Sequence, residues 1–288
     1  MNRMIRGAGA LLMVLLMAPA VQAGRPWWLG LNADYLSDDN INRGPAGQTL
    51  DDSAFGIGAE AGGFLTLGER SGLRVRLHVD ANRHDTYDKL DRSRILAEAS
   101  LRFRPGHGYT ATRYALELGY AMEDWRSSLR DAGVTRIRLQ ADKRLTTRLQ
   151  GRLALGYESR KAEEETFSLD NTLLEGYLNY RLYPSGQLYL DLSARLGEAV
   201  SSLDPSTYGG GYGSRIRYTA WVADDAFLPG WWAYRIDADT GIVDLGFNHA
   251  FSRRLSLDLL ARGYRTRPRE DGPEYSGTAF SLALLYRY

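Results

Sequence analysis

Charged side chains recur at every second residue in several segments of the 288-residue chain, and their spacing points to electrostatic chemistry. Between residues 73 and 80, leucine and valine alternate with Arg74, Arg76, His78 and Asp80. Successive side chains of a β-strand point to opposite faces, so this spacing sets a charged row against an apolar row. The candidates for a pore lining are Arg74, Arg76, Arg136, Arg138, Arg148 and Arg152, followed by Glu175, Asp191, Asp244 and Asp258.

The two groups of charges allow two interpretations, if the strands close around a lumen. Opposed basic and acidic rows would create a transverse field in a water-filled pore and would orient polar or anionic solutes, as rings of charged side chains select ions. Alternatively, the same residues would pair across a narrow lumen and plug it. A twelve-stranded barrel is intermediate between small filled barrels and wide porins, which leaves both interpretations open.

Catalysis finds little support among the histidines. A lipid hydrolase or acyltransferase would need a histidine near a serine and an orienting polar group at the membrane interface. His78 falls among arginines, and the other three fall in a loop, a turn and near a strand end; no G-x-S-x-G motif occurs. We therefore assign no catalytic residue and expect that the protein is not an enzyme.

Metal and nucleic-acid binding are also disfavoured. Two groups of aspartates, at 38–39 with 51–52 and at 85–91, lack the spacing of a defined calcium loop and are interpreted as solvated loop acids. The chain has no cysteine, so a thiolate metal site is impossible. Lys+Arg and Asp+Glu nearly balance at 36 and 35, which argues against a nucleic-acid partner. No metal and no cofactor is expected.

The first 23 residues are typical of a secretory signal peptide. Arg3 and Arg6 precede an apolar core from Ala8 to Val21, and Val21-Gln22-Ala23 is a small-residue cleavage pattern. A retained helix is the less favoured alternative, because about 20 apolar residues are needed to span a bilayer. We expect residues 1–23 to be removed and residues 24–288 to form one domain.

The remaining chain divides into strand-length alternating segments, with short turns and longer loops in turn. Twelve strands are favoured, with a long loop at about 201–237 that would constrict the lumen or act in surface recognition. Fourteen is the alternative, if Gly213–Val222 and Trp231–Asp237 form a further hairpin. Trp27, Trp28 and Trp125 lie near strand ends and are interpreted as interfacial anchors.

The last segment has the clearest alternation. From Thr278 to Tyr288, one row of alternate residues is apolar and then aromatic, as expected for a strand whose outer face meets lipid and whose end lies in a membrane interface. The chain resembles stand-alone Gram-negative outer-membrane β-barrels, in which such an ending is recognised by the barrel assembly machinery. The residues of this predicted assembly signal are Phe280, Leu282, Leu284, Tyr286 and Tyr288.

The resemblance implies an all-β fold, a transmembrane antiparallel up-and-down β-barrel in the cell outer membrane, reached through the periplasm. Its partners would be outer-membrane lipids, lipopolysaccharide, the assembly machinery and periplasmic chaperones. Tyr234–Thr240, followed by Leu245-Gly246-Phe247, is similar to a segment of uncharacterised proteobacterial barrels, which implies no activity.

Three functions remain open from the sequence. The favoured one is a passive, porin-like channel that transports small polar or anionic solutes. The alternative is a non-conducting barrel that serves as a surface or export accessory or as a structural protein. An interfacial lipid-modifying enzyme is the weaker alternative.

Overall fold

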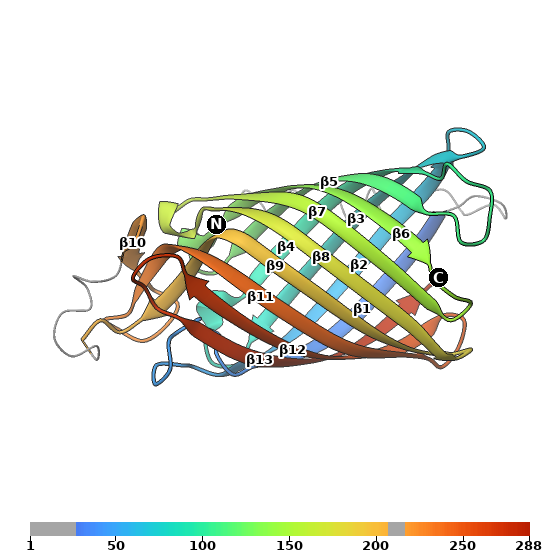
Figure 1. Ribbon diagram of the computed structural model, residues 1–288. Helices are drawn as coiled ribbons and strands as arrows, with labels where there is room; N and C mark the ends of the chain where they lie inside the picture. Colours follow the sequence, from blue (N-terminus) through green and yellow to red (C-terminus); the bar gives the residue numbers. More distant parts are fainter. Residues whose placement is uncertain (1–26, 207–216) are drawn as a thin grey trace.

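The computed structural model describes residues 27–206 and 217–288, which form a closed antiparallel barrel of twelve strands and one short extra strand (Figure 1). The predicted signal peptide lies outside the described residues. The strands are β1 (Trp27–Asp38), β2 (Asp52–Thr66), β3 (Ser71–His84), β4 (Arg92–Phe103), β5 (Arg113–Trp125), β6 (Ala132–Arg144), β7 (Leu149–Ala162), β8 (Leu169–Tyr183), β9 (Gly186–Leu203), β10 (Ala220–Ala223), β11 (Trp232–Ala250), β12 (Leu255–Pro268) and β13 (Tyr275–Arg287).

Two pairings close the barrel. Strand β9 pairs with β11, and the last strand, β13, pairs with the first, β1, with Tyr35 opposite Leu282. A closed sheet satisfies the backbone hydrogen bonds of the wall and leaves no edge, which is the condition for strands to cross a bilayer. The predicted count of twelve strands is therefore confirmed.

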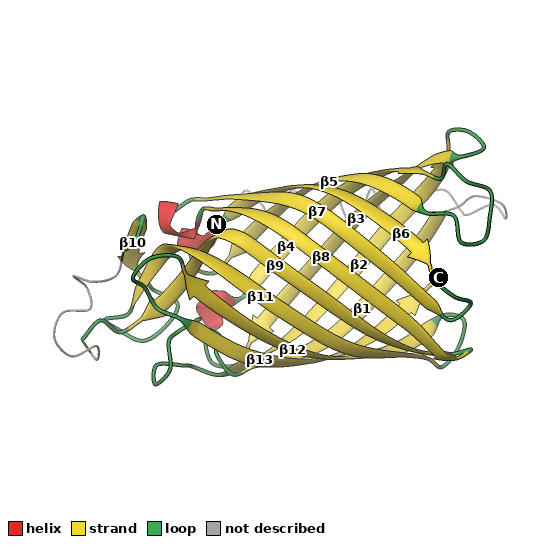
Figure 2. Ribbon diagram, in the orientation of Figure 1, coloured by secondary structure: helices red, strands yellow, loops and turns green. Residues whose placement is uncertain are grey.

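Short turns join the strands at one end of the barrel, here called the turn end, and longer loops join them at the other, the loop end. Both the start of β1 and the end of β13 lie at the turn end, as an even strand number requires. Three short 3-10 helices, η1 (Asp88–Leu90), η2 (Ser128–Arg130) and η3 (Glu165–Phe167), lie at the loop end (Figure 2). None of the helices in the described ranges is long and apolar enough to cross a membrane.

Alternation gives the barrel an apolar exterior and a polar interior. On β13, Phe280, Leu282 and Leu284 point outward and are 62%, 46% and 43% exposed. Their partners on β12 continue this outer face as Ala261, Leu259 and Leu257. So many exposed apolar side chains on a closed wall indicate that lipid, not water, surrounds it.

This alternation makes a sharp prediction for neighbouring residues of β13. Leu282→Arg would place a charge in the lipid belt and should destabilise the barrel by roughly 2–4 kcal/mol. Ala283→Arg should cost much less, because residue 283 points inward and its cross-strand neighbours are Asp34 and Asp258. Urea unfolding in lipid vesicles, followed by tryptophan fluorescence, measures both; equal losses would contradict the assigned faces.

The region predicted as a loop at about 201–237 is partly strand. Strand β9 runs to Leu203, β11 begins at Trp232, and these two residues are cross-strand partners. The hairpin of the fourteen-strand alternative exists only in part, because β10 pairs with the first four residues of β11 at the loop end and adds no strand to the wall. Of its other predicted residues, 217–219 are not in a strand and 213–216 lie outside the described part.

The longer β9 and β11 form a small apolar core inside the loop end. Its buried residues include Leu203 and Ile236, at 0% and 1% exposed, with Tyr234 beside them. The inner face of these strands is apolar here because loops cover it. Beyond the lipid belt the outward side chains do not have to be apolar. Alternation between apolar and polar residues therefore stops before the strands do, and it places the loop-end limits of β9 and β11 too close to the membrane.

Candidate functional site in the charged lumen

The strand register places the predicted pore-lining residues on the inner face, with one exception. One inward row runs around half of the barrel through Asp142, Arg152, Tyr177, Asp191, Asp244 and Arg262. A second row passes through Arg74, Ser100, Glu117 and Arg138, and a third through Arg76, Glu98, Gly119, Arg136 and Glu158. Asp258 also points inward, where it accepts a hydrogen bond from Tyr189 at 2.7 Å.

Arg148 is a correction to the predicted lining. It lies in the exposed turn between β6 and β7, because β7 begins only at Leu149. The turn is centred later than the alternation indicated, so Arg152 is opposite Asp142 and binds it at 2.8 Å. A hairpin centred on residues 144–147 would instead have set Asp142 near Arg148.

The basic residues pair mainly with acids on adjacent strands, which the sequence analysis did not select. Arg138 lies between Glu117 and Glu175, with N–O distances of 2.5 and 2.8 Å. Among the described ion pairs, only the contact between Arg138 and Glu175 joins the predicted basic group to the predicted acidic group. Further pairs are Arg76 with Glu98 and Arg136 with Glu158, whereas Asp244, an acid of the predicted lining, pairs with Arg262, which was not predicted.

Two acids near the loop end of the lumen each bind several cations. Asp80 binds Arg92 at 3.2 Å and Arg94 at 2.9 Å, and His78 lies 3.2 Å away. Glu123 binds Arg160 and, at 3.7 Å, Arg92, and it accepts a hydrogen bond from the indole of Trp125 at 3.2 Å. These networks hold long side chains against the wall, which limits how far they extend into the lumen.

Three hollows remain along the inside of the barrel, with volumes of about 570, 170 and 620 Å³. They share lining residues: Glu98 and Glu117 border the first two, and Arg76 borders the last two. Arginines outnumber glutamates in the lining of each. The interior is therefore neither plugged by ion pairs throughout nor split into opposed rows of charge; it combines local pairing with a basic excess in the linings of these three hollows.

The first loop, residues 39–51, folds across the inside of the loop end. The amide of Asn42 donates to the carbonyl of Ser202 at 2.8 Å, although three strands of the wall separate β9 from β1. Arg43 binds Asp38 at 2.8 Å, lies over the ring of Tyr264, and lines the hollow at this end. Its φ of 55° lies in the left-handed region, which these contacts hold at a cost of about 1 kcal/mol.

Residues 217–231 belong to the long connection between β9 and β11, and they cross the opening of the barrel at the loop end. Asp224, 5% exposed, forms a bidentate pair with Arg130 of η2 at 2.9 and 2.8 Å and accepts a hydrogen bond from Ser202. Phe227 packs edge-on against Tyr87, with ring centroids 5.2 Å apart. Burial raises the pKa of the Tyr87 phenol, which keeps this ring neutral in the contact. The loop is thus joined to two other loops, those that contain η1 and η2.

Several other predicted roles differ in the structure. Trp28 and Trp125 point into the lumen, where Arg74 and Arg92 lie over their rings at 4.8 and 5.3 Å, so they are not interfacial anchors. Asp38 and Asp52 are buried at 3% and 6% exposure, and Asp52 accepts hydrogen bonds from the backbone of the second loop. These aspartates fix loop backbone and are not solvated. Across the described residues, no group of three or more acids or histidines has the arrangement of a metal site.

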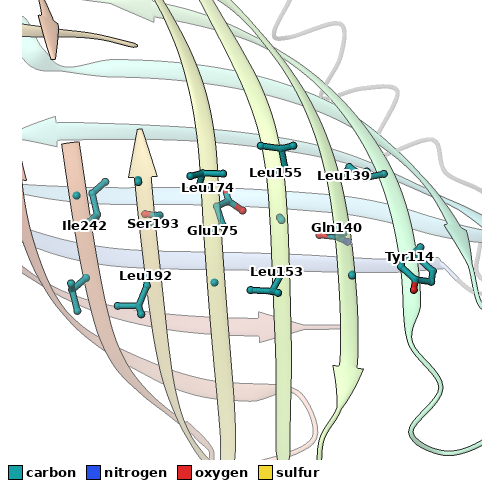
Figure 3. Close-up of a pocket in the computed structure, with 16 residues that line it drawn as sticks. Tyr114, Leu139, Gln140, Leu153, Leu155, Leu174, Glu175, Leu192, Ser193 and Ile242 are labelled. Atoms are coloured by element: carbon teal, nitrogen blue, oxygen red, sulfur yellow. The ribbon is translucent and has the colours of Figure 1, made fainter. Parts of the chain in front are cut away.

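A further hollow lies on the outer face and has an apolar lining. Its volume is about 770 Å³, and its lining includes leucines from each of the strands β6 to β9 (Figure 3). Leu153 and Leu155 belong to the outward row, whereas Gln140 and Glu175 point inward. Small residues such as Gly176 and Ala194 lower the surface between the leucines. The hollow faces lipid and suits acyl chains, not a polar solute.

Comparison with known proteins identifies the fold. No family model and no curated protein sequence matches this chain. Among solved structures, the COG4313 outer membrane channel from Pseudomonas putida F1 is similar with a TM-score of 0.60 and 10% identity, over 93% of this chain and 100% of that one. The NanC porin is similar at a TM-score of 0.46 and 7% identity, over 90% and 98% of the two chains. The closed wall, the apolar outer face and the shared fold place this chain in the outer membrane as a twelve-stranded β-barrel.

Proposed function

We propose that this barrel is a passive channel for small polar solutes and that it favours anions. The observation that carries the proposal is the lumen itself: three neighbouring hollows that share lining residues and in whose linings arginine is the most frequent charged residue. Arg74 and Arg102 line the small hollow near the turn end and form no ion pair in the described part of the chain. A low-dielectric wall strengthens the field of these unpaired arginines, which would concentrate anions and exclude cations. No catalytic group is part of this proposal.

Orientation follows from the connections. In outer-membrane barrels the short turns are periplasmic and the longer loops extracellular. The turn end of this barrel would then face the periplasm, and loop 39–51 and residues 217–231 would narrow the extracellular entrance. A solute would pass these loops first and meet the unpaired arginines near the periplasmic exit.

Solute uptake into proteoliposomes tests the proposal. Gluconate, glucitol and glucosamine have nearly equal size and differ in charge, so they separate charge selection from sieving. We expect gluconate to enter several-fold faster than glucosamine, and the ratio to fall as salt screens the lumen. Equal and negligible uptake of all three solutes, with folded barrel verified by heat-modifiable gel mobility, would contradict a channel.

The same assay addresses the rival function, a non-conducting barrel that acts through its loops. The buried Arg130–Asp224 pair favours that rival, because it fixes the loop over the mouth. A barrel without uptake, both with and without residues 205–230, would support it. Uptake that appears only after the loop is removed would support a gated channel.

A further inference from the structure

We infer that the small hollow near the turn end is a binding site for the oxyanion group of a solute, such as a carboxylate or a phosphate. The hollow has a volume of about 170 Å³ and lies between β3, β4, β5, β6 and β7. Its lining residues are Arg74, Arg76, Glu98, Ser100, Arg102, Glu117, Arg138, Gln140 and Arg152. The inference rests on the proposed channel function and names the solute group that the lumen would recognise.

Two arginines of the hollow lack an acidic partner, and the strand register explains why. The cross-strand neighbours of Arg74 are Phe64 and Ser100, and those of Arg102 are Gly72 and Ala115. Neither arginine forms an ion pair with a carboxylate in the described part of the chain. Neither the glycine nor the alanine has a polar side chain that could pair with Arg102.

Four polar atoms at this hollow are buried without a hydrogen-bond partner in the structure. They are Oγ of Ser100, Nε of Arg102, Nε of Arg138 and Oε1 of Gln140. Ser100 and Gln140 are only 4% and 5% exposed. Leaving buried polar groups unpaired is costly, so several of them around one hollow indicate that a polar ligand completes their hydrogen bonds.

The chemistry of these groups favours an oxyanion. Three of the four atoms belong to donors, the two guanidinium groups and the serine hydroxyl, and arginine forks match the geometry of carboxylate and phosphate oxygens. Oε1 of Gln140 is an acceptor and would take a hydrogen bond from another group of the solute, such as a hydroxyl. Arg74 is held by its contact with the ring of Trp28, with the guanidinium carbon 4.8 Å from the ring centroid. An anion would also relieve the repulsion between arginines that have no acid of their own. The two acids that line the hollow, Glu98 and Glu117, already pair with Arg76 and Arg138, so they offer little attraction to a cation.

Binding of inorganic phosphate and of succinate to the folded barrel in detergent micelles, measured by calorimetry at low chloride, tests this site. We expect saturable binding of either anion and about a tenfold loss of affinity in Arg102→Gln, because one charge-assisted contact is removed. Arg74→Gln should behave similarly. Arg148→Gln is the matched control, since it makes the same charge change at the same end in an exposed turn.

The outcomes separate this site from the channel proposal. Unchanged affinity in an Arg74→Gln, Arg102→Gln double variant, in a barrel that still transports gluconate, would overturn the site and leave the channel. Saturable binding lost in the double variant, in a barrel with no uptake, would support the site and contradict the channel. Equal loss of affinity in Arg148→Gln would show that net charge alone attracts the anion, which also overturns the site.

Discussion

Asp224→Ala should raise the conductance of the barrel to the level of a variant that lacks the loop altogether. The change leaves Arg130, 7% exposed, with its remaining contacts to Ser127 and the ring of Phe167 but without the bidentate carboxylate. Breaking a buried pair in this way costs roughly 3–5 kcal/mol. That energy would shift a closed loop towards the open state by about a hundredfold or more.

A matched neighbour provides the control for this prediction. Asp225→Ala removes the adjacent carboxylate, which is 40% exposed, lies 3.5 Å from Lys89 and 4.0 Å from Arg130, and accepts a hydrogen bond from Ser127 at 2.5 Å. Because these contacts are more exposed and Asp224 still holds Arg130, its conductance should rise much less than that of Asp224→Ala. In the reference variant, Asn-Gly replaces residues 205–230, because Leu203 and Trp232 are paired and a short turn can join them. Equal conductance of all four proteins would show that the loop does not restrict the path.

Arg138→Met should destabilise the barrel by about 2–4 kcal/mol, the second large effect. Arg138 separates Glu117 and Glu175, and without it two inward carboxylates face each other with no cation between them. The side chains of all three are only 14–20% exposed, so water screens the repulsion weakly. Urea unfolding in lipid vesicles would measure the loss.

Neutral partners should reverse this loss. Adding Glu117→Gln and Glu175→Gln to Arg138→Met removes the charges that are left unpaired, and most of the stability should return. If the triple variant were as unstable as Arg138→Met alone, the loss would come from packing and not from charge. A charge reversal, Arg138→Glu, would bring three carboxylates together and is therefore a poor probe of selectivity.

The sequence predicted the wall of the barrel well because one physical rule governs it. Side chains alternate between lipid and lumen, so rows such as Phe280, Leu282 and Leu284 identify a strand and its outer face without any knowledge of its partners. The twelve strands, the turn and loop ends, and the inward position of most charged candidates all follow from this rule.

The pairing of the charges could not be predicted in the same way, because it depends on register. A turn centre displaced by about two residues changes which side chains face each other, as for Asp142 and Arg152. Glu98 and Glu117 lie in alternating rows that were visible in the sequence, yet only the register shows that they neutralise Arg76 and Arg138. The same limit hid the unpaired state of Arg74 and Arg102.

The loop contacts had no periodic signal at all. Asn42 and Arg43 lie in a polar segment that resembles any solvated loop, but they reach the end of β9 and line the lumen. Likewise, the sequence does not distinguish Asp224 from the neighbouring aspartate, and only the fold shows that it binds Arg130. These contacts join residues far apart in the chain, and only the closed barrel sets their distance.

The most direct test of the channel proposal is the reversal potential of single channels in a planar bilayer under a steep KCl gradient. The basic excess of the three hollows predicts steady conductance with chloride favoured over potassium, and a smaller preference as the mean salt concentration rises. A preference for potassium would contradict the proposed selectivity. Silence from both the unmodified barrel and the variant without residues 205–230, with folding verified, would contradict the channel itself.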